Sequence, residues 1–260
     1  MPEITKSVIA EAIARGWFEL HYQPIVDARN AAYIKIRGFE ALARLNYGGQ
    51  LLPPAAFLPA VGEFEMAVAF GDWVIESAVA QARRWSNAGV IGAHPIAINI
   101  SDEQFSDTVL VARIRARLWA VELHESMIEL EISESATLFG DMAHRQVREM
   151  QRCGLVVVLD DVGTGNTHLH VLADLADLGV RTLKIDRQYV SGCTQRGGGY
   201  TLRKMVELAR DLGMHVIAEG VENEAQALFL RQHNCNVMQG YYFARPMSVA
   251  DVERYMVRRD

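Results

Sequence analysis

Several kinds of residue are scarce in this sequence, and each scarcity excludes a class of protein. Only three of the 260 residues are cysteines, Cys153, Cys193 and Cys235, which are too few and too far apart for a disulfide framework or a zinc site. No apolar run approaches the roughly 20 residues that span a bilayer, and the longest, residues 155–159, has the length of a strand. The N-terminal residues lack the apolar stretch of a signal peptide. The sequence therefore predicts a cytoplasmic protein without a membrane segment.

Positive charge is also in short supply. Lysine and arginine together number 26 against 32 aspartates and glutamates, and the net charge of −6 argues against a protein that binds DNA through a basic face. An anionic substrate remains compatible with this charge if bound divalent ions reverse the local field. Half of the residues are hydrophobic, and no repeat, linker or low-complexity tract divides the chain. We therefore expect a single domain over residues 1–260.

Runs rich in β-formers alternate with amphipathic helical runs along the chain. The expected strands cover residues 18–27, 33–45, 96–100, 127–132, 155–160, 182–185, 215–218 and 236–238. The last six follow one another at the spacing of βα units, and several are apolar without alternation, as in parallel strands covered on both faces. The first two are joined by too few residues for a helical crossover, which predicts an antiparallel hairpin. Eight strands with helices after most of them indicate a closed (β/α)8 barrel of the α/β class.

Polar residues stand at or just beyond the carboxyl ends of these strands. In chain order they are Glu40, Asn99, Glu131, Asp160 with Asp161, Lys184 with Asp186, Glu219 and Gln239. The strand ends of a (β/α)8 barrel meet at one mouth, where active sites lie. Carboxylates from several strands would repel one another there without a cation, and Mg²⁺ and Mn²⁺ prefer oxygen ligands. A single acid at a strand end more often caps a helix or faces solvent, so the complete set is what predicts a metal site.

Two residue types in this set suggest a particular chemistry. The adjacent carboxylates of Asp160 and Asp161 suit a pair of metal ions, which together hold the attacking and leaving oxygens of a phosphoryl displacement. Lys184 is one of only four lysines in the chain. An ammonium group in such a ring can stabilise a phosphate oxygen or hold an attacking water.

A series of short motifs runs in order through residues 18–247. The motifs are Gln23-Pro24-Ile25-Val26, Glu40-Ala41-Leu42 followed by Arg44, Asn99-Ile100-Ser101, Glu131-Ile132-Ser133-Glu134-Ser135, Asp160-Asp161-Val162-Gly163-Thr164-Gly165, Leu183-Lys184-Ile185-Asp186, Ala218-Glu219-Gly220-Val221-Glu222, Gln239-Gly240-Tyr241 and Arg245-Pro246. This ordered set resembles the EAL-domain family of cyclic-di-GMP phosphodiesterases. The resemblance implies a TIM-like barrel with one antiparallel strand. It also implies hydrolysis of cyclic di-GMP to linear pGpG, a step in the turnover of a bacterial second messenger.

The resemblance implies a role for each matching residue. The residues that match ligands of two metal ions, Mg²⁺ or Mn²⁺, are Glu40, Asn99, Glu131, Asp160 and Asp161. The residues that match catalytic groups are Lys184, Glu219, Asp161 and Gln239. Glu219 is then the general base, the group that orients the water, or a ligand of the second ion. The residues that match substrate contacts are Gln23, Arg44, Asp186 and Glu222, and Glu134 matches an acid that anchors the loop after the fifth barrel strand.

The resemblance also bears on partners. It implies a homodimer, and family members often carry a sensor or cyclase domain, for which this chain has no room. The loop after Asp161 departs from the family pattern of Phe-Gly-Thr-Gly-Tyr-Ser-Ser, because it reads Val162-Gly163-Thr164-Gly165-Asn166-Thr167-His168. This loop and the following helix resemble the family's dimer contact, so we expect an effect on activity or on its coupling to dimerisation.

Two other interpretations remain open. A non-catalytic receptor for cyclic di-GMP would typically lack the first glutamate of the Glu40-Ala41-Leu42 motif or part of the metal set, and both are present here. A barrel metal enzyme that acts on another substrate rests on likeness of fold alone.

Overall fold

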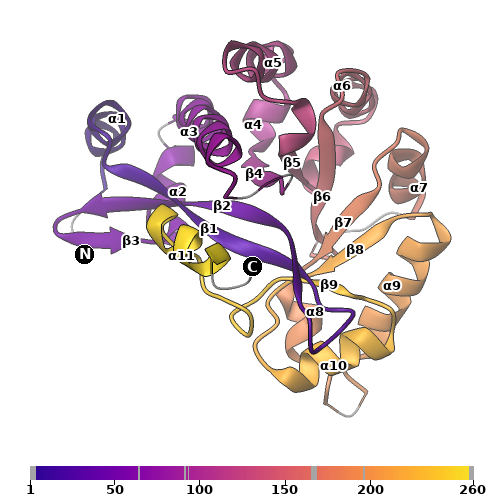
Figure 1. Ribbon diagram of the computed structural model, residues 1–260. Coiled ribbons are helices and arrows are strands. Elements are labelled where there is room, and N and C mark those ends of the chain that lie inside the picture. The colour runs from indigo at the N-terminus through magenta and orange to yellow at the C-terminus, as the bar shows by residue number, and fades with distance from the viewer. Residues whose placement is uncertain are drawn as a thin grey trace.

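A closed barrel of eight strands forms the centre of the computed structural model, which describes residues 4–257 apart from 64, 91, 93, 165–168 and 196. Its strands are β1 (Phe18–Asp27), β2 (Lys35–Tyr47), β4 (Ile96–Ile100), β5 (Ile128–Ser133), β6 (Val156–Val162), β7 (Thr182–Ile185), β8 (His215–Ala218) and β9 (Val237–Met238). β1 closes the barrel by pairing antiparallel with both β2 and β9, and the other barrel pairs are parallel. The predicted TIM-like (β/α)8 barrel with one antiparallel strand is therefore confirmed (Figure 1).

The hairpin of β1 and β2 extends beyond the barrel. The two strands pair along their whole length, whereas β2 pairs with β4 only over residues 39–41. A short strand that the sequence analysis did not predict, β3 (Gln50–Leu52), pairs with the outer end of β2. Glu40 was expected at the end of its strand, and this placement is wrong because β2 continues to Tyr47. Glu40 instead lies where β2 leaves the barrel and enters the hairpin.

Helices surround the barrel and the hairpin (Figure 1). They are α1 (Lys6–Arg15), α2 (Pro54–Glu63), α3 (Ala67–Ala88), α4 (Asp102–Phe105), α5 (Leu110–Ala120), η1 (Glu125–Met127), η2 (Ser135–Phe139), α6 (Asp141–Arg152), α7 (Leu169–Asp177), α8 (Arg187–Ser191), α9 (Tyr200–Asp211), α10 (Glu224–Gln232) and α11 (Val249–Val257). Local signals set several ends. Ser101 and Gln104 form a capping box at the start of α4, and Gly89 ends α3 with a φ of 69°. Among the described helices, none is both long and apolar enough to cross a membrane.

The barrel interior changes from apolar to polar along the strands. A small apolar cluster of Ile25, Ala97 and Ile217 fills one layer. Because side chains alternate between the two faces of a strand, residues two positions farther along share the same interior face. For β4 that residue is Asn99, and for the end of β8 it is Glu219. The apolar layer therefore forms the floor on which the polar mouth is built.

Candidate active site

A cavity of about 320 Å³ opens at the carboxyl ends of the barrel strands. It is lined by Gln23, Glu40, Leu42, Asp160, Asp161, Asp186, Arg187, Glu219, Gly220, Glu222, Gln239, Gly240 and Tyr241. Eight of the predicted site residues are in this set. Asn99, Glu131 and Lys184 are not lining residues. Asn99 and Lys184 lie against residues that are, and Glu131 lies against Lys184. Arg44 is half-buried outside the lining, and its guanidinium donates to the neighbouring carbonyl of Ala43.

Lys184 lies at the centre of the acidic residues. Its ammonium nitrogen is 2.6 Å from a carboxylate oxygen of Glu219 and 3.0 Å from one of Glu131. The same nitrogen is 3.4 Å from Asp160 and 3.5 Å from Glu40. The residue is only 1% exposed, so this charge is compensated by the carboxylates and not by water. Four strands thus direct carboxylates at one buried lysine.

Negative charge exceeds positive charge in this cluster, and the pKa values reflect the excess. Burial alone would lower the pKa of Lys184, but the surrounding carboxylates raise it well above its usual value. Burial raises the pKa of Glu131 well above its ordinary range, although Lys184 opposes the shift. Apart from the ion pair with Lys184, neither carboxylate oxygen of Glu131 has a hydrogen-bond partner among the described residues. A single ammonium group therefore leaves buried acceptor capacity unused, which fits a site for a divalent cation.

Asp161 joins two of these acid groups at the rim of the cluster. One oxygen from each of Asp160, Asp161 and Glu219 lies within 4.8 Å of the other two. Burial raises the pKa of Glu219 to about 8, and burial together with the charges of Asp160 and Asp186 raises the pKa of Asp161. The raised pKa values mean that these carboxyl groups tend to keep a proton when no cation is near. Carboxylate oxygens held this close together are the ligands that Mg²⁺ or Mn²⁺ binds. The residues present fit the predicted metals.

Lys184 and two amide side chains favour the ionised form of Glu40. Asn99 donates to one carboxylate oxygen at 2.9 Å and Gln239 donates to the other at 2.6 Å. Burial opposes ionisation of Glu40, but Lys184 and the two amides together lower its pKa. Gln239 also donates to Gln23 at 3.2 Å, which ties β1 to β9 across the cavity. Since Asn99 uses its amide nitrogen on Glu40, its carbonyl oxygen stays free to act as a ligand.

The turn after β6 is clamped from both sides. Asp161 adopts a φ of 55°, in the left-handed region that a non-glycine residue rarely occupies. At Gly163 the N–H donates to Glu134 at 2.9 Å, and the C=O accepts from the hydroxyl of Tyr189 at 2.5 Å. A Cβ on Gly163 would lie 2.6 Å from the Tyr189 ring, so only glycine fits. The rest of the departing loop, residues 165–168, lies outside the described residues.

Replacing Glu134 by alanine is expected to lower the affinity for the metal ions, so that more metal is needed for turnover. The change frees the N–H of Gly163, two residues from Asp161, and loss of such an outer contact typically lowers metal affinity about tenfold to hundredfold. The metal concentration that gives half-maximal turnover would report the loss. Glu224→Ala, at an exposed position of α10, is the control and should leave this concentration unchanged. An unchanged value in Glu134→Ala would show that the carboxylate does not position the turn.

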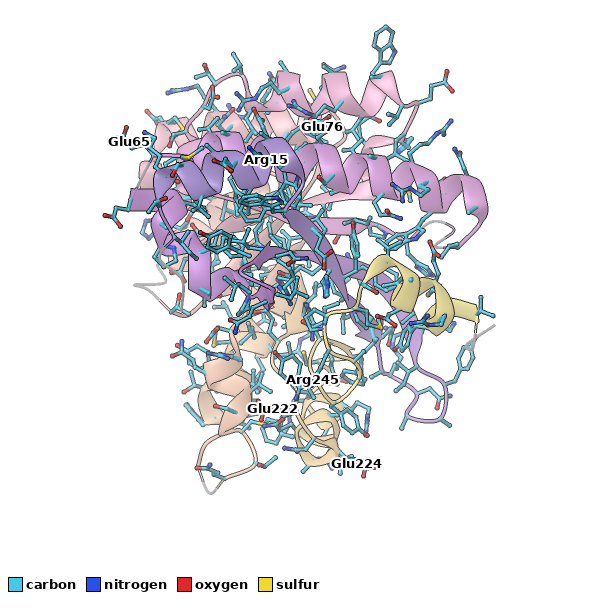
Figure 2. All side chains as sticks on the ribbon, turned by 90° about the vertical axis from the view of Figure 1, so that its left-hand side faces the viewer. Arg15, Glu65, Glu76, Glu222, Glu224 and Arg245 are labelled. Carbon is cyan, nitrogen blue, oxygen red and sulfur yellow. The ribbon has the colours of Figure 1, made fainter. Side chains whose placement is uncertain are left out.

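The residues predicted to contact substrate lie around the rim, with differing secondary roles. Asp186 lines the cavity and also caps α8 by accepting the N–H of Gln188. Burial lowers the pKa of Arg44, and the charges of Tyr241 and Glu40 oppose this shift. The Arg44 guanidinium therefore interacts with the charges of two cavity residues, although it does not line the cavity itself. Glu222 lines the cavity, and Figure 2 shows it at the end of the molecule built by the C-terminal segments.

Three side chains of the cavity wall were not predicted from the sequence. Arg187 follows the predicted Asp186 directly, and Leu42 belongs to the quoted Glu40-Ala41-Leu42 motif. Tyr241 also stands in a quoted motif, and the guanidinium of Arg245 lies 4.1 Å from the centre of its ring. Motif membership could have indicated Leu42 and Tyr241. No local pattern marks Arg187, because its role depends on where the turn into α8 meets the mouth.

Comparison with known proteins gives consistent matches. A model of the EAL domain family matches residues 7–246. The signaling protein YkoW of Bacillus subtilis is 32% identical over 255 residues, which cover 97% of this chain and 31% of YkoW. The cyclic di-GMP phosphodiesterase PdeR of Escherichia coli K12 is 30% identical over 253 residues, which cover 96% of this chain and 37% of PdeR. A solved structure described as the PaMucR phosphodiesterase in complex with c-di-GMP has a TM-score of 0.86 at 33% identity, covering 94% of this chain and 97% of that one.

These matches differ in how much of the other protein they cover. The chain spans about a third of the length of the curated relatives, so those proteins contain further segments. The family model, in contrast, is matched over nearly the whole chain. On this match and on the shared barrel, the chain belongs to the EAL domain family.

Proposed function

We propose that the chain hydrolyses one phosphodiester bond of cyclic di-GMP to give linear pGpG, with Mg²⁺ or Mn²⁺ as cofactor and two ions in the site. The observation that carries the proposal is the buried cluster in which Glu40, Glu131, Asp160 and Glu219 surround one lysine at the mouth of the barrel. Such an excess of carboxylates is stable when cations bind among them. The names of PdeR and of the PaMucR complex support cyclic di-GMP as substrate.

The metal ligands in this proposal are Glu40, Asn99, Glu131, Asp160 and Asp161. When bound, the two ions neutralise the phosphodiester oxygens and lower the pKa of a water that attacks phosphorus. Asn99 and Gln239 keep the Glu40 carboxylate oriented toward the site. The clamp on Gly163 sets the direction of Asp161.

Lys184, Glu219, Asp161 and Gln239 act on the reacting groups. Glu219 is an acceptor for the proton of the attacking water, since burial brings its pKa near neutrality, where a general base works best. The ammonium of Lys184 lies 2.6 Å from Glu219 and holds the carboxylate that accepts this proton. The same ammonium stabilises the negative charge that develops on the phosphoryl oxygens.

The rim residues Gln23, Arg44, Asp186 and Glu222 contact or orient the substrate. Carboxylates at the rim are acceptors for the N–H groups of guanine, and the Arg44 guanidinium complements a phosphate. Guanine carries such donors on its Watson–Crick edge and adenine does not carry the same set. The proposal therefore includes a preference for the guanine dinucleotide.

We further propose that residues 18–247 act as one catalytic domain and that the domain works as a homodimer in the cytoplasm. The continuous family match over residues 7–246 supports one domain. Analytical ultracentrifugation of the purified chain would test the dimer. A monomer at working concentrations with full activity would contradict it.

Removal of metal is expected to abolish product formation. Purified chain with cyclic di-GMP should yield pGpG on chromatography when Mg²⁺ or Mn²⁺ is present, and no pGpG in EDTA, because the carboxylates alone repel the anionic substrate. Cyclic di-AMP serves as the matched control substrate and should be hydrolysed at least about tenfold more slowly. Binding of cyclic di-GMP without turnover would instead indicate a receptor, and equal turnover of both dinucleotides would contradict the rim assignment.

A further inference from the structure

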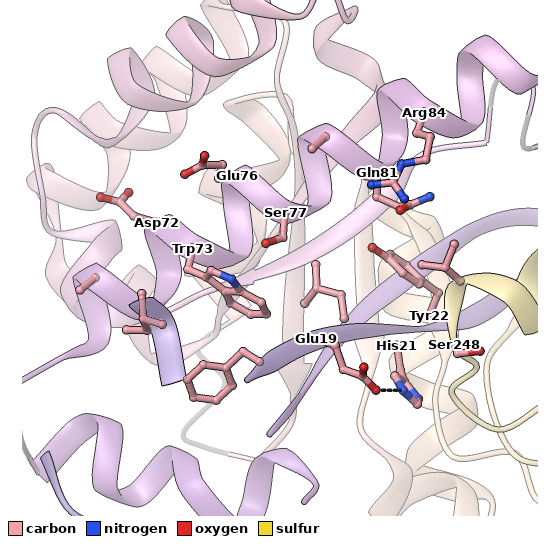
Figure 3. A pocket seen from close by; sticks show the side chains of 16 residues that line it. Glu19, His21, Tyr22, Asp72, Trp73, Glu76, Ser77, Gln81, Arg84 and Ser248 are labelled. Atoms are coloured by element: carbon pink, nitrogen blue, oxygen red, sulfur yellow. Dashed lines mark hydrogen bonds and ion pairs between the residues drawn. The ribbon is translucent and has the colours of Figure 1, made fainter. Parts of the chain in front are cut away.

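A groove of about 760 Å³ runs between β1 and α3, away from the mouth of the barrel (Figure 3). One wall is the outer half of β1, from Phe18 to Tyr22, and the other is a stripe of α3. Ser248 and the start of α11 border the groove. Figure 2 shows Glu76 of this groove and Glu222 of the mouth at opposite ends of the molecule.

The backbone of β1 presents an unpaired edge to this groove. Tyr22 exchanges both of its backbone hydrogen bonds with Met247, so its N–H and C=O point away from β2. Trp17 points the other way, because its C=O accepts from Asn46 beside β2. Peptide groups alternate along a strand, which places the N–H and C=O of Leu20 on the same edge as those of Tyr22. Leu20 has no partner there among the described residues.

The neighbouring segment explains why this edge stays open. The chain at Met247 runs antiparallel to β1 and would meet Leu20 two residues later. It leaves the edge instead, because Ser248 accepts the N–H of Asp251 and α11 begins at Val249. An edge that carries unpaired N–H and C=O groups is a template for one more strand.

The helix wall leaves room for such a strand. Ala69, Ser77 and Ala80 are small residues of α3 that line the groove, and Ala80 is exposed. Gln81 also lines it, is 4% exposed, and its amide nitrogen has no hydrogen-bond partner among the described residues. A buried amide without a partner is costly unless a ligand satisfies it. The helix wall of the groove therefore holds one buried polar group that the described residues leave unsatisfied.

One charged side chain at each end of the groove determines which charges a bound segment should carry. Asp72 is already paired with Arg113, but Glu76 and Arg84 have no ion-pair partner within the described chain. Figure 3 shows Glu76 near Trp73 at one end and Arg84 near Tyr22 at the other. Eight residues of helix separate them by about 12 Å, which an extended chain covers in about four residues. Positions four apart in a strand share a face.

We propose that this groove binds an extended peptide segment that adds to β1 as an antiparallel strand. The segment enters the groove past Met247, which already pairs with Tyr22, and its backbone joins the open edge at Leu20. An acidic residue before this paired stretch reaches Arg84, and a basic residue four positions later pairs with Glu76. The order of the two charges follows from the direction of the segment. Phe18 packs on Trp73 and Tyr22 packs on Trp85, so β1 and α3 run in the same direction. A strand antiparallel to β1 then begins at the Arg84 end. Backbone pairing provides the binding and the two charges provide the selectivity.

The test uses a capped octapeptide of valine and threonine with glutamate at its second position and lysine at its sixth. Amide exchange measured by NMR reports pairing directly. The peptide should slow exchange of the Leu20 amide about tenfold or more, while the amide of Glu19, which already faces β2, is unaffected. A second peptide with lysine and glutamate exchanged should bind about tenfold more weakly.

Two variants of the protein complete the test. Ala80→Trp fills the groove from an exposed position and should abolish the protection of Leu20, whereas Ala116→Trp, at an exposed position of α5, should not. The double variant Glu76→Arg with Arg84→Glu should reverse the preference between the two peptides. No protection at Leu20, or a preference that survives the charge reversal, would overturn the proposal. So would a Leu20 amide already protected in a dimer that Ala80→Trp dissociates, because a second copy would then be the occupant.

Discussion

Replacing Glu40 by alanine is expected to lower the turnover of cyclic di-GMP about a thousandfold, which corresponds to roughly 4 kcal/mol of transition-state stabilisation. The change removes a carboxylate that faces Lys184 at 3.5 Å and that accepts from both Asn99 and Gln239. A metal ion would lose a ligand, and the two amides would lose the acceptor that orients them. Steady-state rates, together with Mn²⁺ affinity from titration calorimetry, would measure both losses.

The fold is expected to survive this substitution. Lys184 keeps three carboxylate partners. Asn99 is exposed and can turn to water, so the main cost is the buried amide of Gln239, which loses one of its two acceptors, about 1–3 kcal/mol at most. Circular dichroism and thermal unfolding would check this, and Glu40→Gln serves if the alanine variant is unstable. Glu103→Ala, at an exposed position of α4, is the control and should leave the rate unchanged. Full turnover in the Glu40 variants would remove Glu40 from the metal site.

Replacing Lys184 by methionine is expected to destabilise the metal-free protein by about 3–5 kcal/mol. The side chain is 1% exposed and pairs with four carboxylates, which would be left buried and uncompensated. For a chain of this size the loss corresponds to a fall of about 10 °C in Tm. Denaturant unfolding in EDTA would measure it. Added Mg²⁺ or Mn²⁺ should restore part of the stability, because a cation then replaces the missing charge.

The pH dependence of stability and a variant at an exposed lysine provide the controls for this prediction. Without Lys184 the pKa values of Glu131 and Glu219, already raised by burial, rise further, so the folded state binds more protons than the unfolded state. The stability of the variant then falls as pH rises, and the deficit shrinks as pH is lowered. Lys204→Met, at an exposed lysine of α9, should change stability by less than about 0.5 kcal/mol. Equal losses at both lysines would contradict a central role for Lys184.

The strands illustrate how far local pattern predicts this fold. The expected ranges for β1, β4, β7 and β8 agree with the structure at both ends. The ends of β2, β5, β6 and β9 differ by one or two residues, because fraying and continuation at strand ends depend on neighbours. β3 was missed, since three residues are too few for an alternation to stand out. The placement of Glu40 was wrong for a similar reason. β2 extends beyond the barrel because β1 continues to pair with it, and this pairing depends on a neighbouring strand.

Sequence alone determined the barrel, its antiparallel strand, and the set of acidic and amide residues at the mouth. Those features follow from periodicity, connection length and residue type, which are local properties of the chain. Tertiary structure alone decided that Lys184 is buried among four carboxylates, that Tyr189 closes the clamp on Gly163, and that Arg44 stands outside the cavity lining. It also decided that the edge of β1 stays open beside α3. Distances between side chains on different strands depend on how the sheet closes and twists, and no pattern within one segment contains that information.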